Sequence, residues 1–519
     1  MYLIIIIYIL IFFNNILMFN KYNFEIIKKD FYGRIGKLNT NHGTIETPIF
    51  LPVINPHDQI ISPLEMKNFN VNMIITNSYI IYSDKKLREE LIEKGLHNYF
   101  NFNGPIMTDS GSYQLSVYGN ININNNEIIK FQNLIDSDIC VPLDIPTKPY
   151  QSYEHAYNDL IITNQRIKEA EKLYETNNYN SILACPIQGS THLELREKSS
   201  LFNSNIDCGL YPIGAVVPLM ESYKYEDIVN IIISSKKHLN LTKPVHLFGA
   251  GHPSMFSLAV LLGCDIFDSA SYVLYAKSDR YITSTKTYKL NNLKYLPCTC
   301  PICTSYTLNE IKESTNKTKL LSMHNLYVIL NEIKIIKQCI FEGSLFELVE
   351  QRCHSHPKLI DGFKNINKYS KLIELIDPSS KSTFKSFGSY SSMRPEIIKY
   401  NNRLNRFNFK NVKNALIRTS CFIHDSKFDQ LLNFKPPIGA YPIELEETYP
   451  FNLEVPNTPS YQELKCGILN TIKLINLNKH IKFSFVIEKN ISDNILFNDL
   501  LVLLEKYCNL IYEKDYLFS

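Results

Sequence analysis

Eight short apolar runs, separated by longer stretches with helical spacing, recur between residues 47 and 269. The runs are Thr47–Val53, Met73–Asn77, Pro105–Asp109, Ile139–Asp144, Ile182–Gln188, Leu210–Val216, Val245–Gly251 and Cys264–Ser269. Segments between them, such as Asp84–Lys94 and Ser152–Tyr174, carry charges along one face of a helix. Eight strands interleaved with helices over about 250 residues predict a (β/α)8 barrel. A doubly wound open sheet is the alternative, but no glycine-rich phosphate loop follows the first run.

Six of these runs finish in polar residues or glycine. The endings are Asp109-Ser-Gly-Ser-Tyr113-Gln114, Asp144, Gln188-Gly-Ser190, Gly214-Ala-Val216-Val217-Pro218, Gly249-Ala-Gly-His252 and Asp268-Ser269. In a barrel, such endings lie on the carboxyl-terminal rim, where active sites are found. Any single one is equally well explained as a helix cap or a turn. Six together favour a site at the rim.

The last run ends in a carboxylate. If it is a strand, Cys264, Ile266 and Asp268 share one face. Asp265 and Phe267 then share the other face. A strand that ends in an inward carboxylate is how parallel α/β enzymes present a catalytic group. We therefore predict that Asp268 faces the site and that Asp265 is structural.

The rim endings suggest chemistry on a glycosidic bond. Asp109 and Asp268 end different strands, and reactions at an anomeric carbon use such a pair as acid/base and nucleophile. Asp144 and Gln188 could read the edge of a guanine-like ring, and Tyr113 could stack on it. Each of these three also has a plain structural explanation, such as a helix cap for Asp144.

Three cysteines and a histidine have the spacing of a metal site. Cys298-x-Cys300-x2-Cys303, followed by His324, supplies the soft thiolates and imidazole that tetrahedral Zn²⁺ prefers. A closed set of four leaves no position for substrate, so we predict a structural zinc. Unrelated buried cysteines are the alternative for the thiols, and His354 and His356 compete with His324 as the fourth ligand.

Composition indicates a reduced, globular protein. The chain has 519 residues, a net charge of only +3 and twelve cysteines, most of them scattered singly. We expect a cytoplasmic protein in which any basic surface is local. Met1–Leu17 is strongly apolar but lacks the basic start and cleavage site of a signal peptide. We expect either a misassigned start, with Met18 the true one, or a real membrane anchor.

The carboxyl-terminal part differs in character from the barrel. We expect the barrel domain with its zinc-binding insertion to span residues 18–377, a serine-rich linker 378–392, and a smaller α+β region 393–519. Basic residues interleaved with aromatics near its start suit contacts with RNA phosphates and bases, although a solvated basic face is the alternative. The residues proposed for tRNA contact are Arg394, Lys399, Arg403, Arg406 and Lys410.

Taken together, the motifs resemble one enzyme family. The segments Asp109-Ser-Gly-Ser-Tyr-Gln, Asp144-Ile-Pro-Thr, Pro186-Ile-Gln-Gly-Ser, Gly214-Ala-Val-Val-Pro, Phe267-Asp-Ser-Ala-Ser-Tyr and Cys-x-Cys-x2-Cys…His are similar to those of the tRNA-guanine transglycosylases. The resemblance covers roughly residues 22–375 and is strongest to the archaeal, archaeosine-pathway branch, the 7-cyano-7-deazaguanine tRNA-ribosyltransferases.

The resemblance implies a zinc-containing barrel that exchanges a guanine in tRNA for a free 7-deazaguanine. Asp268 would be the nucleophile and Asp109 the general acid/base. Tyr113 would stack on the base, while Asp144, Gln188 and Gly214 would bind it. The backbone at Val216 and Val217 would meet the 7-substituent. Backbone N–H groups beside two valines suit the neutral nitrile of 7-cyano-7-deazaguanine (preQ0) better than the cationic aminomethyl group of preQ1.

The archaeal branch acts on guanine 15 in the D-arm of tRNA. Relatives are dimers that often end in a PUA-type RNA-binding domain; we expect no complete PUA domain here, and therefore a possible separate PUA-domain partner. A homodimer is expected, and no membrane association unless Met1–Leu17 is translated. The alternatives are a queuine- or preQ1-type enzyme acting at anticodon position 34, and a non-catalytic tRNA-binding paralogue or subunit.

Overall fold

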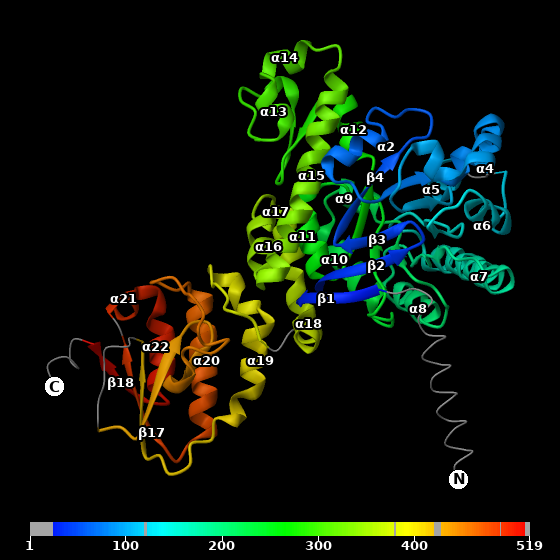
Figure 1. Cartoon of the computed structure of the whole chain (residues 1–519). Helices are drawn as coiled ribbons and strands as arrows, with labels where there is room; N and C mark the ends of the chain where they lie inside the picture. The colour runs from blue at the N-terminus through cyan, green and yellow to red at the C-terminus, as the bar shows by residue number, and fades with distance from the viewer. Residues whose placement is uncertain (1–23, 119–121, 378–379, 420–426, 488, 514–519) are drawn as a thin grey trace, which may run out of the picture. The chain divides into compact units, whose positions relative to one another are not determined.

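The computed structural model describes residues 24–118, 122–377, 380–419, 427–487 and 489–513. It divides into two compact units, residues 1–341 with 348–365, and residues 342–347 with 366–519. Figure 1 shows the elements of both. The apolar stretch Met1–Leu17 lies outside the described residues. Among the residues that are described, no helix is long and apolar enough to cross a membrane.

The first unit is built on eight parallel strands, which confirms the predicted barrel. The strands run in the order β8-β7-β6-β5-β4-β11-β10-β9. Isolated bridges Ala184↔Leu210 and Ile187↔Ile213 join β8 to β9 and close the circle. The strands are β4 (Ile49–Ile54), β5 (Ile74–Asn77), β6 (Ile106–Asp109), β7 (Ile139–Cys140), β8 (Ile182–Leu183), β9 (Tyr211–Ile213), β10 (Val245–Leu247) and β11 (Ile266–Ser269).

Helices surround these strands and cover their outer face. The strands are short and apolar on both faces, as expected for a parallel sheet that is buried on each side. The helices that follow them are α2 (Pro63–Met66), α3 (Ser78–Ser83), α4 (Lys85–Phe100), α5 (Ser112–Tyr118), α6 (Asn125–Leu134), α7 (Tyr153–Asn177), α8 (Leu193–Asn203), α9 (Val217–Glu221), α10 (Tyr225–Lys236), α11 (Phe256–Leu261) and α12 (Ser271–Lys277).

A three-stranded antiparallel sheet closes the amino-terminal end of the barrel. It consists of β1 (Phe24–Asp30), β2 (Gly33–Thr40) and β3 (Gly43–Thr47). Leu38 and Ile45 from this sheet share one apolar core with Ile266 inside the barrel. Arg34 on β2 forms a buried ion pair with Asp265, with Nη2 and Oδ2 2.7 Å apart. Asp265 is therefore structural and Ile266 faces inward, as the strand alternation predicts.

The zinc-type cysteines lie in an insertion after α12. Strands β12 (Arg280–Ile282) and β13 (Thr287–Lys289) form a hairpin, and two short helices, α13 (Pro301–Ser305) and α14 (Leu308–Glu313), precede the long helix α15 (Lys317–Glu342). Helices α16 (Leu345–Cys353) and α17 (Pro357–Asn365) follow it. A capping box between Thr307 and Glu310 begins α14.

The second unit has a five-stranded sheet in the order β16-β15-β14-β17-β18. Its elements are α18 (Ser370–Ile376), α19 (Pro395–Arg403), β14 (Asn414–Arg418), β15 (Gln430–Lys435), β16 (Gly439–Pro442), α20 (Tyr461–Leu477), β17 (Lys482–Ile487), α21 (Lys489–Ser492), α22 (Asn498–Glu505) and β18 (Asn509–Tyr512). Part of the expected linker belongs to this unit, because Phe384 is 1% exposed and lies in its apolar core. Residues 378 and 379 of that linker lie outside the described residues.

Candidate active site

Asp268 lies at the carboxyl end of β11, on the inner face of the barrel. Its Oδ1 accepts a hydrogen bond from the backbone N–H of Gly249 at 2.9 Å. His246 Nε2 lies 2.8 Å from the same oxygen, so the ring N–H donates to the carboxylate. His246 is fully buried on β10, the neighbouring strand. These two donors hold one carboxylate oxygen in place, and Oδ2 has no hydrogen-bond partner among the described residues.

Asp109 lies at the end of β6, and β5 supplies its partner. Asn77 Nδ2 donates to Asp109 Oδ2 at 3.0 Å, while Asn77 Oδ1 caps α3. Burial, together with the negative charges of Asp144 and Asp268, raises the pKa of Asp109 to about 7. The charges of all three carboxylates therefore act on one another within one site, and Asp109 can carry or release a proton near neutral pH.

Asp144 and Gln188 form the floor of this site. Both are buried, and Gln188 Nε2 donates to Asp144 Oδ2. Burial raises the pKa of Asp144. Gln188 Oε1 is buried without a hydrogen-bond partner among the described residues, which leaves an acceptor for an N–H of a bound molecule. Gly214 faces this pair, because a Cβ there would lie 2.3 Å from Gln188 Nε2.

The remaining predicted base contacts lie at the same rim. Tyr113 is 69% exposed in the first turn of α5, directly after the β6 end that carries Asp109. Val216 is buried and caps α9, whose first residue is Val217. The first N–H groups of a helix lack partners within that helix and point outward from its start. Pro218 has no N–H and the N–H of Leu219 bonds to the carbonyl of Val216, so Val217 supplies the N–H at this helix start that can donate to a bound molecule.

Sequence reasoning missed three supporting residues, Asn77, His246 and Arg196. Asn77 ends its predicted strand in a polar side chain, which is the same signal that identified Asp109. His246 lies within a predicted strand and pairs in register with Ile266, so strand alternation could have placed it on the face of Asp268. Arg196 lies in a helix, and no local pattern indicates its role.

The predicted metal ligands come together in the insertion. The ligand atoms of Cys298, Cys300, Cys303 and His324 all lie within 4.8 Å of one another. His324 Nδ1 is 3.4 Å from the sulfurs of both Cys300 and Cys303. His324 Nε2 lies 2.9 Å from the carbonyl oxygen of Ile282, which leaves Nδ1 to bind a metal. Three thiols and one imidazole fit a tetrahedral zinc site.

A second group of possible ligands lies at the other end of the barrel. His42 Nδ1 and His97 Nε2 each lie 3.1 Å from an oxygen of Asp138. The two imidazole rings stack with centroids 3.5 Å apart and planes 22° from parallel. An ion lies in the plane of each imidazole that binds it, at about 2.0–2.1 Å for zinc, and stacked rings offer no such common point. This group is a hydrogen-bonded cluster that fixes the β2–β3 turn.

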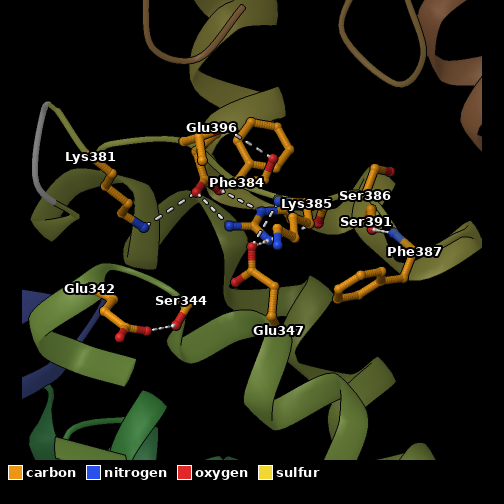
Figure 2. Close-up of polar contacts among 12 residues, drawn as sticks. Glu342, Ser344, Glu347, Lys381, Phe384, Lys385, Ser386, Phe387, Ser391 and Glu396 are labelled. Carbon is orange, nitrogen blue, oxygen red and sulfur yellow. Dashed lines mark hydrogen bonds and ion pairs between the residues drawn. The ribbon is translucent and has the colours of Figure 1, made fainter. Parts of the chain in front are cut away.

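The structure corrects one predicted tRNA contact. Arg394 is fully buried in the second unit and pairs with Glu347 and Glu396 at 2.9 and 3.0 Å. Figure 2 shows these two glutamates, together with Lys381, which also pairs with Glu396. Arg394 is therefore not available to a phosphate. Of the other candidates, Arg403, Arg406 and Lys410 are exposed and Lys399 is half-buried.

Comparison with known proteins places this chain in a family. Residues 30–358 match the family model described as queuine tRNA-ribosyltransferase. A tRNA-guanine(15) transglycosylase of Methanosarcina barkeri is 50% identical over 493 residues, covering 95% of this chain and 99% of that protein. The Archaeoglobus fulgidus protein of the same name is 43% identical over 472 residues, covering 90% and 95%. The Methanobrevibacter smithii one is 43% identical over 451 residues, covering 83% and 68%. The chain belongs to the queuine tRNA-ribosyltransferase family.

Proposed function

We propose that this protein is a tRNA-guanine(15) transglycosylase that replaces guanine 15 in the D-arm with preQ0. The main support for the proposal is that Asp268, Asp109 and Asp144 interact at one rim of the barrel. Relatives of this chain bear the same name. Guanine 15 must leave the tRNA core to reach this rim, at a cost of roughly a few kcal/mol.

In the first half of the reaction, Asp268 Oδ2 attacks C1′ of the ribose. The C1′–O bond forms as the bond from C1′ to N9 of guanine breaks, and guanine leaves with a proton from Asp109. His246 and Gly249 hold the other carboxylate oxygen, so they orient the attacking one. The product of this step is a covalent ribosyl ester of Asp268.

In the second half, preQ0 takes the place of guanine. Asp109 accepts the proton from N9 of the incoming base, N9 attacks C1′, and Asp268 leaves as a carboxylate. The pKa of Asp109, raised to about 7, suits a group that must give and accept a proton in alternate steps. The bonds broken and formed are equivalent, so the exchange needs no ATP.

The floor of the site supports a deazaguanine. Asp144 can accept from the ring N–H and amino groups, and Gln188 can complete the recognition of the same edge. Tyr113 provides an exposed ring for stacking. The rim near the 7-position is made by the backbone at Val216 and Val217, which favours a neutral nitrile over the cationic aminomethyl group of preQ1. This preference separates the proposal from an enzyme acting at position 34 with queuine or preQ1.

Other parts of the proposal concern structure and partners. We assign a structural Zn²⁺ to Cys298, Cys300, Cys303 and His324, whose donor set fits that ion. We further propose a cytoplasmic homodimer that acts on tRNA. A separate PUA-domain chain is a further proposed partner, which would supply additional RNA binding. A non-catalytic paralogue is less favoured, because both Asp109 and Asp268 are present and supported.

The test is exchange of radiolabelled guanine into unmodified tRNA. Wild-type protein should exchange guanine, and Asp268→Asn should lose about a thousandfold or more of the rate because the amide is no nucleophile. In the same assay preQ0 should inhibit more strongly than preQ1. No exchange by the wild type, or near-full activity of Asp268→Asn, would refute the function. Equal inhibition by both bases would refute the preference for preQ0.

A further inference from the structure

One face of helix α8 lies against the loop that carries Gln188. Ser199 Oγ accepts from the backbone N–H of Gln188 at 3.2 Å, and Asn203 Nδ2 donates to the carbonyl of Pro186 at 3.1 Å. The loop lies tightly against the helix, because a Cβ on Gly189 would lie 2.8 Å from the backbone nitrogen of Arg196. The position of Gln188 is therefore set by α8.

Arg196 on this helix connects two different loops of the site. Its guanidinium donates to the carbonyls of Ile187 at 2.8 Å and Ser190 at 2.9 Å, on either side of Gln188. Its third bond, at 3.0 Å, is to the carbonyl of Gly214 in the next loop around the barrel. The planar guanidinium fixes the relative directions of these three bonds.

The environment of Arg196 is unusual for a positive charge. The side chain is fully buried, and among the described residues its guanidinium bonds only to backbone carbonyls. Burial lowers the pKa of Arg196 to about 9, while the carbonyl dipoles and the more distant negative charge of Asp144 favour the charged form. A buried arginine that bonds only backbone carbonyls fixes the relative position of the two loops it joins and places a positive charge beside them.

We propose that Arg196 is a positioning residue that sets the width of the base pocket by holding the Gln188 loop to the Gly214 loop. This inference rests on the proposed function. Gly214 leads directly to Val216 and Val217, so the guanidinium fixes the distance between the amide that binds the base edge and the backbone that meets the 7-substituent. With no room for a Cβ at Gly214, a small shift of either loop changes the fit of the base.

The test compares Arg196→Lys with Arg34→Lys. Arg34 is a matched control, because it is also a buried arginine of the first unit and donates to the carbonyl of Lys243 and to Asp265, but at the amino-terminal end of the barrel. Lysine keeps the charge but cannot reach three carbonyls in a fixed plane. KM for guanine, KM for tRNA, kcat, inhibition by preQ0 and Tm would be measured for both variants.

We expect Arg196→Lys to raise KM for guanine, and the preQ0 concentration needed for inhibition, by about 10- to 100-fold. KM for tRNA should rise less than KM for guanine, because phosphate contacts outside the base pocket also hold the tRNA. Arg34→Lys should lower Tm yet leave KM for guanine unchanged. If Arg196→Lys binds guanine and preQ0 like the wild type, or if Arg34→Lys raises KM equally, the positioning role is wrong while the proposed function stands. Absence of exchange by the wild type would overturn both.

Discussion

At the scale of single residues, Asp109 shows what an enclosed site does to a carboxyl group. An isolated aspartate ionises near pH 3.8, whereas burial and two neighbouring carboxylates raise the pKa of Asp109 to about 7 in the folded protein. The motif around Asp109 does not show which side chains surround this carboxyl group in the fold. The raised pKa could therefore not be predicted from the sequence. It has a measurable consequence for stability.

The contribution of Asp109 to stability should fall as the pH rises through the window from about 4 to about 7. In that window the unfolded chain has already released the proton that folded Asp109 retains, so increasing pH favours unfolding. Asparagine does not titrate, so in Asp109→Asn the folded and unfolded states no longer differ in the proton bound at this position. The Tm of the variant minus that of the wild type should therefore increase from pH 5 to pH 8, as measured by thermal unfolding in buffers of equal ionic strength. A difference that does not change with pH would contradict the raised pKa.

Residue roles were predictable where they depend on strand alternation alone. That rule predicted that Ile266 faces inward and that Asp265 is structural, and the structure shows Ile266 in the barrel core and Asp265 paired with Arg34. Roles that depend on partners distant in the chain were not predictable. Arg394 counted as one more positive charge in a basic stretch, yet its partner Glu347 lies 47 residues earlier and removes it from the surface.

At the scale of elements, all eight predicted strands are present, but some are shorter than the apolar runs. The run Ile139–Asp144 forms a strand over only Ile139–Cys140, and Ile182–Gln188 over Ile182–Leu183. Pro142 and Pro186 lie within these runs, and proline cannot donate to a sheet ladder. The chain leaves the strand early there, which makes room for the loops that carry Asp144 and Gln188.

We expect the fold of the insertion after α12 to depend on the proposed zinc ion. Cys300→Ser should reduce zinc from about one ion per chain to near zero and lower Tm by roughly 5 °C or more, because a structural ion adds its binding energy to folding. Zinc would be measured by elemental analysis after dialysis. Cys339→Ser, which changes another thiol on α15, should retain the ion. Undiminished zinc in Cys300→Ser would exclude this ligand set.

At the scale of the whole molecule, the division into units was the hardest feature to predict. A serine-rich stretch was interpreted as a linker, but Phe384 and Ser386 within it are buried in the second unit. Residues 342–347, from the last residue of α15 to the first turn of α16, also belong to that unit. The sequence of these six residues does not indicate the unit to which they belong. Glu347 is assigned to the second unit through its ion pair with Arg394, and only the fold reveals that contact.

The exposed basic residues of the second unit should contribute to tRNA binding through phosphate contacts. Each such contact releases counterions, so log K falls with log salt by about 0.7–0.9 per phosphate. Replacing both Arg403 and Arg406, which are exposed near the end of α19, with alanine should weaken tRNA binding and reduce that slope by about 1.4–1.8, while KM for guanine stays unchanged.

Binding would be measured by fluorescence anisotropy between 50 and about 300 mM salt. Lys506→Ala, an exposed charge of the same unit outside the stretch, serves as the control and should leave the slope unaltered. An unchanged slope in the double variant would assign the stretch to a solvated surface, because charge that contacts no phosphate releases no counterions.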